Sequence, residues 1–355
     1  MGSGVKILML TRYGRLGASS RVRAYQYIGA LEAAGFEVTI RPLLDDGYLR
    51  RRYARDEINV TAVGWAYARR VGTMLRSRRY DLLYIEKELF QWIPGPIERL
   101  LLSGTRYVLD YDDAIFHTYD QHRFGVVRSI LGSKIAGLMQ RAQLVIVGNE
   151  YLAQYAATAG ARRIAVVPTA VDLTRYEERK WPDRAPFTVG WIGSPSTTRY
   201  LNLVAPALAD ACGDGGRVLL VGAREIALPG ARVTRVPWAE ETEVDHIRTF
   251  DLGIMPLPDE PWARGKCGYK LIQYMACGIP VVASPVGVNA QIVAPGVNGF
   301  LPTTLEQWRD ALLTLRARAD LRRSMGEAGR RTVEDGYSSA VVGPTLVNLL
   351  ESAVA

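Results

Sequence analysis

Residues that form disulfides or bind metals are scarce in this sequence. Among 355 residues there are three cysteines, Cys212, Cys267 and Cys277, and three histidines. The cysteines show neither the spacing of a metal site nor an even number for pairing. The sequence therefore predicts a reducing, cytoplasmic compartment and no disulfide framework.

Long apolar runs are also missing. No stretch reaches the eighteen consecutive apolar residues of a membrane-spanning helix. The start, MGSGVKILML, lacks the small-residue cleavage site of a signal peptide, so its apolar run predicts a first strand. The composition, 48% hydrophobic and 23% charged, is typical of a globular protein, and 355 residues suit two domains.

The common nucleotide fingerprints are absent as well. The first glycine-rich turn holds Gly14 and Gly17 but not G-x-G-x-x-G, and no G-x-x-x-x-G-K-[ST] occurs anywhere. The second predicted strand is followed by Arg41 rather than by an acid that would hold a ribose. Hydride transfer with a dinucleotide and P-loop chemistry are therefore both disfavoured.

Short β-branched runs alternate with helical segments along the whole chain, which predicts parallel, doubly wound α/β sheets. The predicted strands cover 5–10, 36–40, 80–85, 106–110, 143–148 and 163–168, and then 187–192, 217–222, 231–236, 251–257 and 279–284. A helix over Ser20–Ala34 would end at Gly35. We expect two Rossmann-like domains that face a cleft. Their predicted bounds are 1–170 and 187–336, with a polar linker over 171–186 and a helix over 337–355 that crosses back to the first domain.

Both halves place glycine directly after their first strand. The two turns read 11-TRYGRLGASSR-21 and 190-GWIGSPSTTRY-200. A glycine turn that leads into a helix exposes backbone N–H groups beside the positive end of the helix dipole. The pattern predicts anion-binding backbone at Gly14 and Gly17 in the first domain and at Gly193 and Ser194 in the second.

One stretch, 265-GKCGYKLIQYMACGIPVVASPVG-287, combines lysines with a short predicted helix. Helical spacing over 266–277 puts Lys266, Lys270, either Gln273 or Tyr274, and Cys277 on one face, and Gly278 would end the helix. Cations in a first turn oppose the helix dipole unless an anion binds there. The pattern predicts a phosphate or diphosphate site, and a solvated helix face remains the alternative.

Residues 265–301, from GKCGYKL to NGFL, resemble the donor-nucleotide motif of GT-B glycosyltransferases. They are most similar to the large family of retaining glycosyltransferases called family 4-like, or group 1, which includes sucrose synthase. The resemblance implies transfer of a sugar from a nucleoside-diphosphate sugar to an acceptor hydroxyl, with retention and without cofactor or metal. The family's ribose-binding glutamate falls on Gln273, and the glutamate that supports the donor sugar falls on Gly265. Arg199 and Asn289 are further donor-binding candidates.

An acidic cluster, 109-LDYDDAIFH-117, follows a first-domain strand. Family members carry a histidine or aspartate from this region near the reacting carbon, so the resemblance implies catalytic roles for Asp113 and His117, beside Lys266 and Lys270. The alternative is that Asp112 or Asp113 caps the helix that follows. His122 and His246 are given no role. Glu86, at the end of another strand, contacts the acceptor or pairs with an arginine, and we favour the second.

Positive charge is concentrated in one segment. Of the net charge of +8, a surplus of six lies between Arg41 and Arg79, where ten arginines face four acids. First domains of similar enzymes bind the acceptor, which is often lipid-linked. The candidates for acceptor or anionic-membrane contact on the inner leaflet are Arg50, Arg51, Arg52, Arg55 and Trp65. A solvated helix face is the other interpretation.

Two other functions stay open at this point. A sugar-nucleotide epimerase on the same fold would need no acceptor. A nucleic-acid-binding module is compatible with the basic patch, but no known nucleic-acid motif occurs and we expect no such partner. The sequence does not identify the sugar, the base, the acceptor or the oligomeric state.

Overall fold

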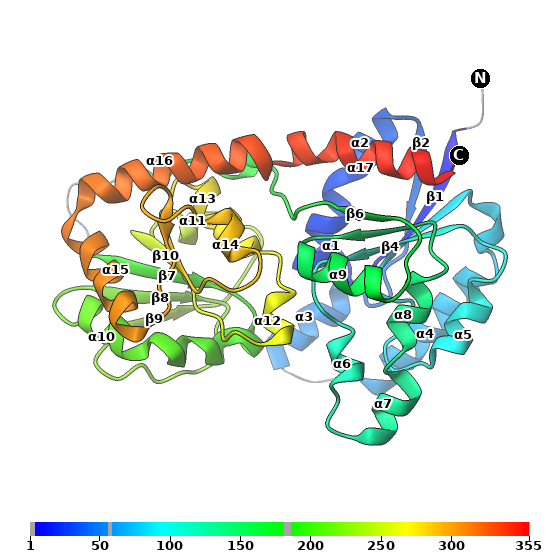
Figure 1. Ribbon diagram of the computed structural model, residues 1–355, viewed down its shortest axis with the longest axis horizontal. Coiled ribbons are helices and arrows are strands. Elements are labelled where there is room, and N and C mark those ends of the chain that lie inside the picture. Colours follow the sequence, from blue (N-terminus) through cyan, green and yellow to red (C-terminus); the bar gives the residue numbers. More distant parts are fainter. Residues whose placement is uncertain (1–3, 56–58, 181–185, 355) are drawn as a thin grey trace. The chain divides into compact units, whose positions relative to one another are not determined.

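The computed structural model describes residues 4–55, 59–180 and 186–354, and the chain divides into two units. Unit 1 comprises the residues up to Thr169 together with those from Val342 onward. Unit 2 comprises Ala170–Val341. Each unit is built around its own six-stranded sheet with helices packed against it (Figure 1). The predicted fold class, two doubly wound α/β domains, is confirmed.

The sheet of unit 1 has the order β2-β1-β3-β4-β5-β6, and all neighbouring strands are parallel. The strands are β1 (Val5–Leu10), β2 (Phe36–Ile40), β3 (Leu82–Glu86), β4 (Tyr107–Tyr111), β5 (Leu144–Val147) and β6 (Ile164–Val166). Strands covered on both faces need apolar side chains at nearly every position, which is why runs such as VKILML predicted them. Each lies within two residues of its predicted bounds.

The helices of unit 1 connect these strands. They are α1 (Ala18–Arg23), α2 (Ile28–Ala33), α3 (Asp46–Arg55), α4 (Val60–Met74), α5 (Gly95–Leu101), α6 (His117–Asp120), α7 (Gly125–Leu131), α8 (Lys134–Met139) and α9 (Glu150–Thr158). The single helix expected over Ser20–Ala34 is interrupted at Ala24, whose φ of −128° is not helical, and a 3-10 turn over Tyr25–Tyr27 separates α1 from α2. Gly35, at φ +90°, ends α2 as predicted.

The C-terminal segment is helical, as expected, and forms α17 (Ser339–Val354). From Val342 onward it belongs to unit 1. Leu346 and Leu350 are buried, and the Arg163 guanidinium donates to Ser352 Oγ at 2.7 Å. Helix α17 therefore completes the core of unit 1.

The sheet of unit 2 has the order β12-β11-β10-β7-β8-β9, again with parallel neighbours. Its strands are β7 (Thr188–Ile192), β8 (Arg217–Val221), β9 (Val233–Val236), β10 (Leu252–Met255), β11 (Val281–Ala283) and β12 (Gly299–Phe300). The short edge strand β12 was not predicted. It pairs only Gly299 and Phe300 with β11, which is too short for a periodic signal.

Two apolar clusters cover the two faces of this sheet. One includes Trp191, Leu220, Leu252 and Leu312, and the other includes Tyr274. The helical elements are η3 (Leu173–Arg175), η4 (Pro195–Val204), α10 (Ala205–Cys212), α11 (Glu243–Ile247), α12 (Pro261–Arg264), α13 (Tyr269–Ala276), α14 (Asn289–Ile292), α15 (Leu305–Ala317) and α16 (Ala319–Gly336).

The segment expected to be a linker, 171–186, is packed into unit 2 over its described part, 171–180. Val171 bridges to Ser338, and Tyr176 is only 3% exposed. The Arg179 N–H donates to the Cys277 carbonyl at 2.9 Å. The polar composition predicted a linker because the two apolar residues that anchor the segment, Val171 and Tyr176, are too far apart to form an apolar pattern. The remaining residues of the segment, 181–185, lie outside the described residues.

Candidate active site

The carboxyl ends of β7, β10 and β11 lie side by side, because these strands are neighbours and parallel. The loop after β10 is tied to the loop after β11, since the Leu257 N–H donates to Ser284 Oγ at 3.0 Å. Ser284 in turn donates its N–H to Met255 O at 3.2 Å. Ligands of open α/β sheets gather at such an edge, which makes it the place to look for donor-binding groups.

Helix α13 starts three residues later than predicted. Gly268, at φ +67°, stands at its N-cap, and a Cβ there would lie 2.3 Å from Ile292 Cδ1. Only glycine fits this left-handed and crowded position. Lys266 therefore lies in the turn before the helix, where its N–H donates to Ala263 O at 3.2 Å. The expected helix over 266–277 is corrected to Tyr269–Ala276, because Gly268 interrupts the backbone between the two lysines.

Lys270, in the first turn of α13, lies against the end of β7. Its Nζ is 5.6 Å from the centroid of the Trp191 ring. A Cβ on Gly193 would lie 2.7 Å from Lys270 Cε and 2.6 Å from the Trp191 ring. The structure thus brings together Lys270 and Gly193, two residues that the sequence assigned to the donor site. The sequence did not identify Trp191 as a donor-site residue. Its position just before the glycine turn was the only signal that could have done so.

Gln273 points into the protein. It is 2% exposed, and its Nε2 donates to Tyr176 Oη at 3.0 Å. Tyr176 Oη lies 3.4 Å from Tyr269 Oη. Burial raises the pKa of Tyr176 well above its ordinary value, so the phenol stays neutral. This arrangement fixes the side chain of Gln273, in the middle of α13, and Tyr176 is a residue that sequence reasoning missed.

Gly265, the position of the missing family glutamate, is buried at the end of α12. The acids just before it are already engaged. Glu260 accepts from Tyr200 Oη at 3.1 Å, and Asp259 accepts from Arg264 at 2.6 Å. The structure therefore offers no carboxylate at position 265 itself.

Asn289 follows the turn after β11 and is 1% exposed. Its Nδ2 donates to Ser284 O at 3.1 Å, while its Oδ1 is buried without a hydrogen-bond partner. Gly287, at φ +56°, allows this turn to approach α12, because a Cβ there would lie 2.5 Å from Arg264 O. A buried unpaired oxygen is costly, so Asn289 fits a role in binding a hydroxyl or N–H donor.

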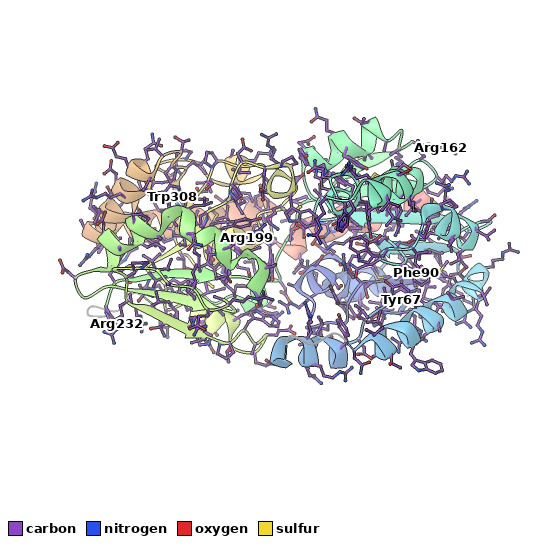
Figure 2. All side chains as sticks on the ribbon, turned by 90° about the horizontal axis from the view of Figure 1, so that it is seen from below. Tyr67, Phe90, Arg162, Arg199, Arg232 and Trp308 are labelled. Atoms are coloured by element: carbon purple, nitrogen blue, oxygen red, sulfur yellow. The ribbon has the colours of Figure 1, made fainter. Side chains whose placement is uncertain are left out.

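Ser194 and Arg199 are exposed at the start of η4, and Arg199 is labelled in Figure 2. The Arg199 guanidinium lies 5.2 Å from the Tyr200 ring centroid. Ser194 Oγ is 3.0 Å from Ser196 Oγ. The N–H of Gly193 donates to Val221 O at 3.0 Å, so this N–H is used by the sheet rather than offered to an anion.

The first-domain glycines are similarly engaged. The N–H of Gly14 donates to Leu44 O, and that of Gly17 donates to Gly14 O. Asp46 accepts from the Leu16 N–H at 2.9 Å, so a carboxylate already occupies this turn. A Cβ on Gly14 would lie 2.2 Å from Asp46 Oδ1, so close packing explains this glycine. The geometry does not favour the anion site expected at Gly14 and Gly17.

The acidic cluster after β4 is divided among several partners. Asp110 forms a buried ion pair with Arg23 at 2.8 Å and also accepts from Tyr84 Oη. Asp112 lies 2.9 Å from Lys87 Nζ and accepts from the Ser19 hydroxyl. Burial raises the pKa of Asp112, but Lys87 and Ser19 outweigh it and hold the pKa at about 2. No side chain caps α6, so the capping alternative for Asp112 and Asp113 does not apply there.

His117 begins α6 and is held on both ring nitrogens. Nδ1 lies 2.8 Å from Asp120 Oδ1, and Nε2 lies 2.8 Å from Tyr151 Oη. Asp113 lies near enough to Lys87 to raise the pKa of that lysine. Asp120 and Tyr151 therefore orient the His117 ring, and both His117 and Asp113 belong to unit 1. Their catalytic roles stay predictions.

Glu86 ends β3 and is 1% exposed. Its Oε2 accepts from the Arg12 N–H at 2.9 Å and from Ser20 Oγ at 2.6 Å, while its Oε1 is buried without a hydrogen-bond partner. Lys87 follows at φ +67°, a strained backbone for a residue with a side chain. These features join the ends of β1 and β3 to the start of α1.

The predicted acceptor or membrane residues lie on α3 and α4. Arg50 and Arg51 are exposed and Arg52 is half-buried, while Trp65 is 73% exposed on α4. The side chain of Arg55 lies outside the described residues. Tyr67 on the same helix turns inward, where its ring packs on Phe90 with centroids 5.2 Å apart (Figure 2). Helix α4 therefore has a packed face and an exposed face that carries Trp65.

Neither a metal cluster nor a membrane span is found within the described residues. No group of three or more histidine, cysteine, aspartate or glutamate side chains in 4–55, 59–180 and 186–354 could hold a metal ion. Over the same ranges, no helix is long and apolar enough to span a bilayer.

Comparisons with known proteins agree with this architecture. Residues 187–318 match the family model described as glycosyl transferases group 1. Sucrose-phosphate synthase from Thermosynechococcus elongatus is 17% identical, with a TM-score of 0.74 over 98% of both chains. Anabaena HepE in complex with UDP-glucose is 19% identical, with a TM-score of 0.72 over 98% of this chain and 99% of that one. WaaG, a glycosyltransferase of lipopolysaccharide biosynthesis, is 14% identical, with a TM-score of 0.70 over 97% of this chain and 99% of that one.

No curated protein matches the chain in sequence. The structural neighbours share the fold at low identity, while the family match falls on unit 2, where Lys270, Gly193 and Asn289 lie at the carboxyl edge of the sheet. The resemblance found in the sequence is thereby confirmed: the chain has the GT-B fold, and its second unit contains the segment that matches group 1 glycosyl transferases.

Proposed function

We propose that this protein transfers a sugar from a nucleoside-diphosphate sugar to the hydroxyl of an acceptor. The observation that carries the proposal is the packing of Lys270 against Gly193 and Trp191 at the carboxyl end of β7. It lies within the segment that matches group 1 glycosyl transferases, and the neighbour HepE binds UDP-glucose. Glycan and lipid-linked acceptors are the expected substrate classes, and WaaG acts in lipopolysaccharide biosynthesis.

The chemistry needs positive charge where the donor breaks. As the bond from the anomeric carbon to the phosphate oxygen lengthens, an oxocarbenium-like sugar forms and negative charge grows on the leaving diphosphate. The ammonium groups of Lys270 and Lys266 would stabilise that negative charge, and the first N–H groups of α13 would stabilise it further. Because two ammonium groups supply this charge, we propose that no metal is required.

The acceptor hydroxyl attacks the anomeric carbon, and its proton passes to an oxygen of the leaving phosphate. This internal return mechanism leads to retention, as the resemblance implies. Asp113 and His117 would contact the reacting sugar or the acceptor rather than remove the proton. Gln273, fixed by Tyr176, and Asn289, with its unpaired Oδ1, would bind hydroxyls of the donor.

A thermal-shift screen tests the donor site. UDP, GDP, ADP, TDP and CMP compounds would be added to the wild type, to Lys270→Ala and to Lys180→Ala, an exposed lysine of the same unit. We expect one class of nucleotide to raise the melting temperature in the wild type and in Lys180→Ala, with most of the shift lost in Lys270→Ala. An equal shift in all three proteins would place the nucleotide elsewhere.

Product analysis separates transfer from the epimerase alternative. Incubation with the stabilising sugar nucleotide and no acceptor should give at most slow hydrolysis, whereas an epimerase would release an isomerised sugar nucleotide. Adding the metal chelator EDTA should leave the rate of transfer unchanged. Loss of activity with EDTA that added Mg²⁺ restores would contradict the metal-free mechanism.

A further inference from the structure

Trp92 in unit 1 has an unusual backbone and an exposed ring. Its φ is +62°, a conformation that costs free energy for any residue with a side chain, and its side chain is 50% exposed. The ring meets Tyr119 edge-on at 5.4 Å and His122 edge-on at 5.7 Å. The Trp92 N–H donates to Tyr119 Oη at 3.3 Å. The surrounding contacts therefore hold a large apolar side chain at the surface.

The support beneath Trp92 is a buried ionic cluster. Tyr119 Oη donates to Glu88 at 2.8 Å, and Lys134 Nζ lies 2.6 Å from Glu88 and 2.8 Å from Glu98. All four side chains are buried. Burying three ionisable groups is costly unless their geometry is well fixed, so this cluster forms a rigid base. The sugar-transfer chemistry proposed above uses none of these groups.

Beside Trp92, helices α6 and α7 form a hairpin that projects from unit 1, at the lower edge in Figure 1. Three of its apolar side chains are turned outward, while Leu131 is buried: Phe124 is 52% exposed, Val126 64% and Ile130 55%. His122 links the hairpin to Trp92, and its ring lies 5.5 Å from that of Phe124. The exposed apolar groups thus continue from the Trp92 loop onto α7.

Positive charge predominates around these groups. The sequence contains no aspartate or glutamate from Gln121 to Asn149. Arg123 and Arg128 are exposed in the hairpin, and the Arg123 guanidinium lies 4.5 Å from the Phe124 ring centroid. Asp120 of α6 is paired with His117 at 2.8 Å, and a second copy of this chain would bring the same exposed arginines against each other. An anionic lipid surface would accept both the arginines and the apolar side chains.

We propose that Trp92 and the α6–α7 hairpin form a docking surface for an anionic phospholipid bilayer. Phe124, Val126 and Ile130 enter the boundary between headgroups and acyl chains, Trp92 lies at the interface, and Arg123 and Arg128 meet lipid phosphates. This surface is separate from the α3–α4 arginines. It extends the proposed function, since it would hold the enzyme where a lipid-linked acceptor resides, but the binding needs no acceptor.

Vesicle flotation tests the surface directly. Phosphatidylcholine vesicles with and without phosphatidylglycerol would be mixed with the wild type, with Phe124→Ser/Ile130→Ser and with Leu203→Ser, a control that removes an exposed leucine of unit 2. We expect the wild type and Leu203→Ser to float with the anionic vesicles, and the double variant to lose tenfold or more in partition coefficient. Arg123→Gln and Arg128→Gln should each lower partitioning about fivefold, and less at high salt.

Two results would overturn the proposal. One is flotation of the double variant at the wild-type level, which would leave the membrane contact to other residues such as Trp65. The other is absence of flotation together with a wild-type dimer that Phe124→Ser/Ile130→Ser dissociates in sedimentation velocity, which would make the hairpin an interface between copies. The nucleotide thermal shift, measured without vesicles, should be the same in the double variant and the wild type. A missing shift in both would count against the proposed function and not against the docking surface.

Discussion

At the scale of single residues, Gly193 and Lys270 form a contact that is open to a double-mutant cycle. The Cβ of Gly193→Ala would meet both Lys270 Cε and the Trp191 ring, so the lysine must move. We expect Gly193→Ala to weaken nucleotide binding by about tenfold to a hundredfold, or about 1.4–2.8 kcal/mol. Lys270→Ala should weaken it to a similar extent. Titration calorimetry with the nucleotide that gives the largest thermal shift would measure both.

The double variant decides whether the two residues act as one unit. In the Lys270→Ala background, Gly193→Ala should change affinity little, which corresponds to a coupling of about 1.4–2.8 kcal/mol. Effects that simply add would show that Gly193 contributes independently of Lys270, for example through the backbone of the turn.

The raised pKa of Glu98 predicts how the free energy of unfolding depends on pH. Burial raises the pKa of Glu98 to about 7, against the opposing effect of Lys134. Because the folded protein holds this proton more tightly than the unfolded chain, the contribution of Glu98 to the free energy of unfolding is complete below pH about 4.5 and is lost as pH rises through about 7. Urea unfolding of the wild type and of Glu98→Gln at several pH values would measure it.

The variant isolates the effect of the carboxyl group. Glu98 accepts from the N–H groups of Leu89 and Phe90 on its two oxygens, and the amide of Glu98→Gln keeps only one acceptor, so the variant should be about 1–3 kcal/mol less stable than the wild type at pH 4.5. The difference between wild type and variant should shrink from pH 4.5 to pH 7. A difference that stays constant, or grows with pH, would contradict the assignment.

A local motif named several donor-site residues from the sequence, and their roles stay predictions. Lys270 and Asn289 were named from the motif over residues 265–301, and both lie at the carboxyl edge of the unit 2 sheet. The partners of these residues could not be predicted in the same way. Tyr176 reaches Gln273 across 97 positions of the chain, and Lys134 reaches Glu88 across 46. Such contacts depend on the order of strands, which periodicity does not encode.

At the scale of elements, Gly268 determines where α13 begins. In Gly268→Ala the new Cβ would strain a backbone at φ +67° and meet Ile292 Cδ1, so we expect the free energy of unfolding to fall by about 2–4 kcal/mol. Gly296→Ala is the matched control, since its φ is +79° but nothing lies within 4 Å of the new Cβ. It should cost about 1 kcal/mol. Thermal and urea unfolding would measure both.

Removing the obstructing atom separates strain from overlap. Ile292→Val lacks Cδ1, so in that background Gly268→Ala should cost no more than Gly296→Ala does. Equal costs with and without Cδ1 would show that the left-handed backbone alone accounts for the loss.

The helices and strands also show which patterns in a sequence are sufficient to predict an element and its bounds. Buried parallel strands were predicted well, because an apolar run has few alternatives. Helix bounds were predicted less well, because Ala24 and Gly268 interrupt helices through backbone geometry that apolar spacing does not reveal. The polar segment before β7 was taken for a linker because composition gives little weight to two anchors such as Val171 and Tyr176.

At the scale of the whole molecule, the two units have separate cores and should respond separately to changes. Leu350 of α17 is fully buried in unit 1, and Leu312 of α15 is fully buried in unit 2. Each leucine-to-alanine change should destabilise its own unit by about 2–5 kcal/mol. Hydrogen exchange measured by mass spectrometry in mild denaturant reports on peptides of each unit, so one experiment follows both.

Binding of the donor nucleotide should then stabilise one unit and leave the other unchanged. If the donor binds at α13 and the turn after β7, a nucleotide at a hundred times its Kd adds about 2.7 kcal/mol to unit 2. Protection lost in Leu312→Ala should therefore return largely in unit 2 peptides, while peptides of unit 1 in Leu350→Ala should stay unprotected. Protection by the nucleotide that is confined to unit 1 would move the donor site to the other sheet. Equal protection of both units would mean that they unfold as one cooperative body, in which case each leucine change must also destabilise both.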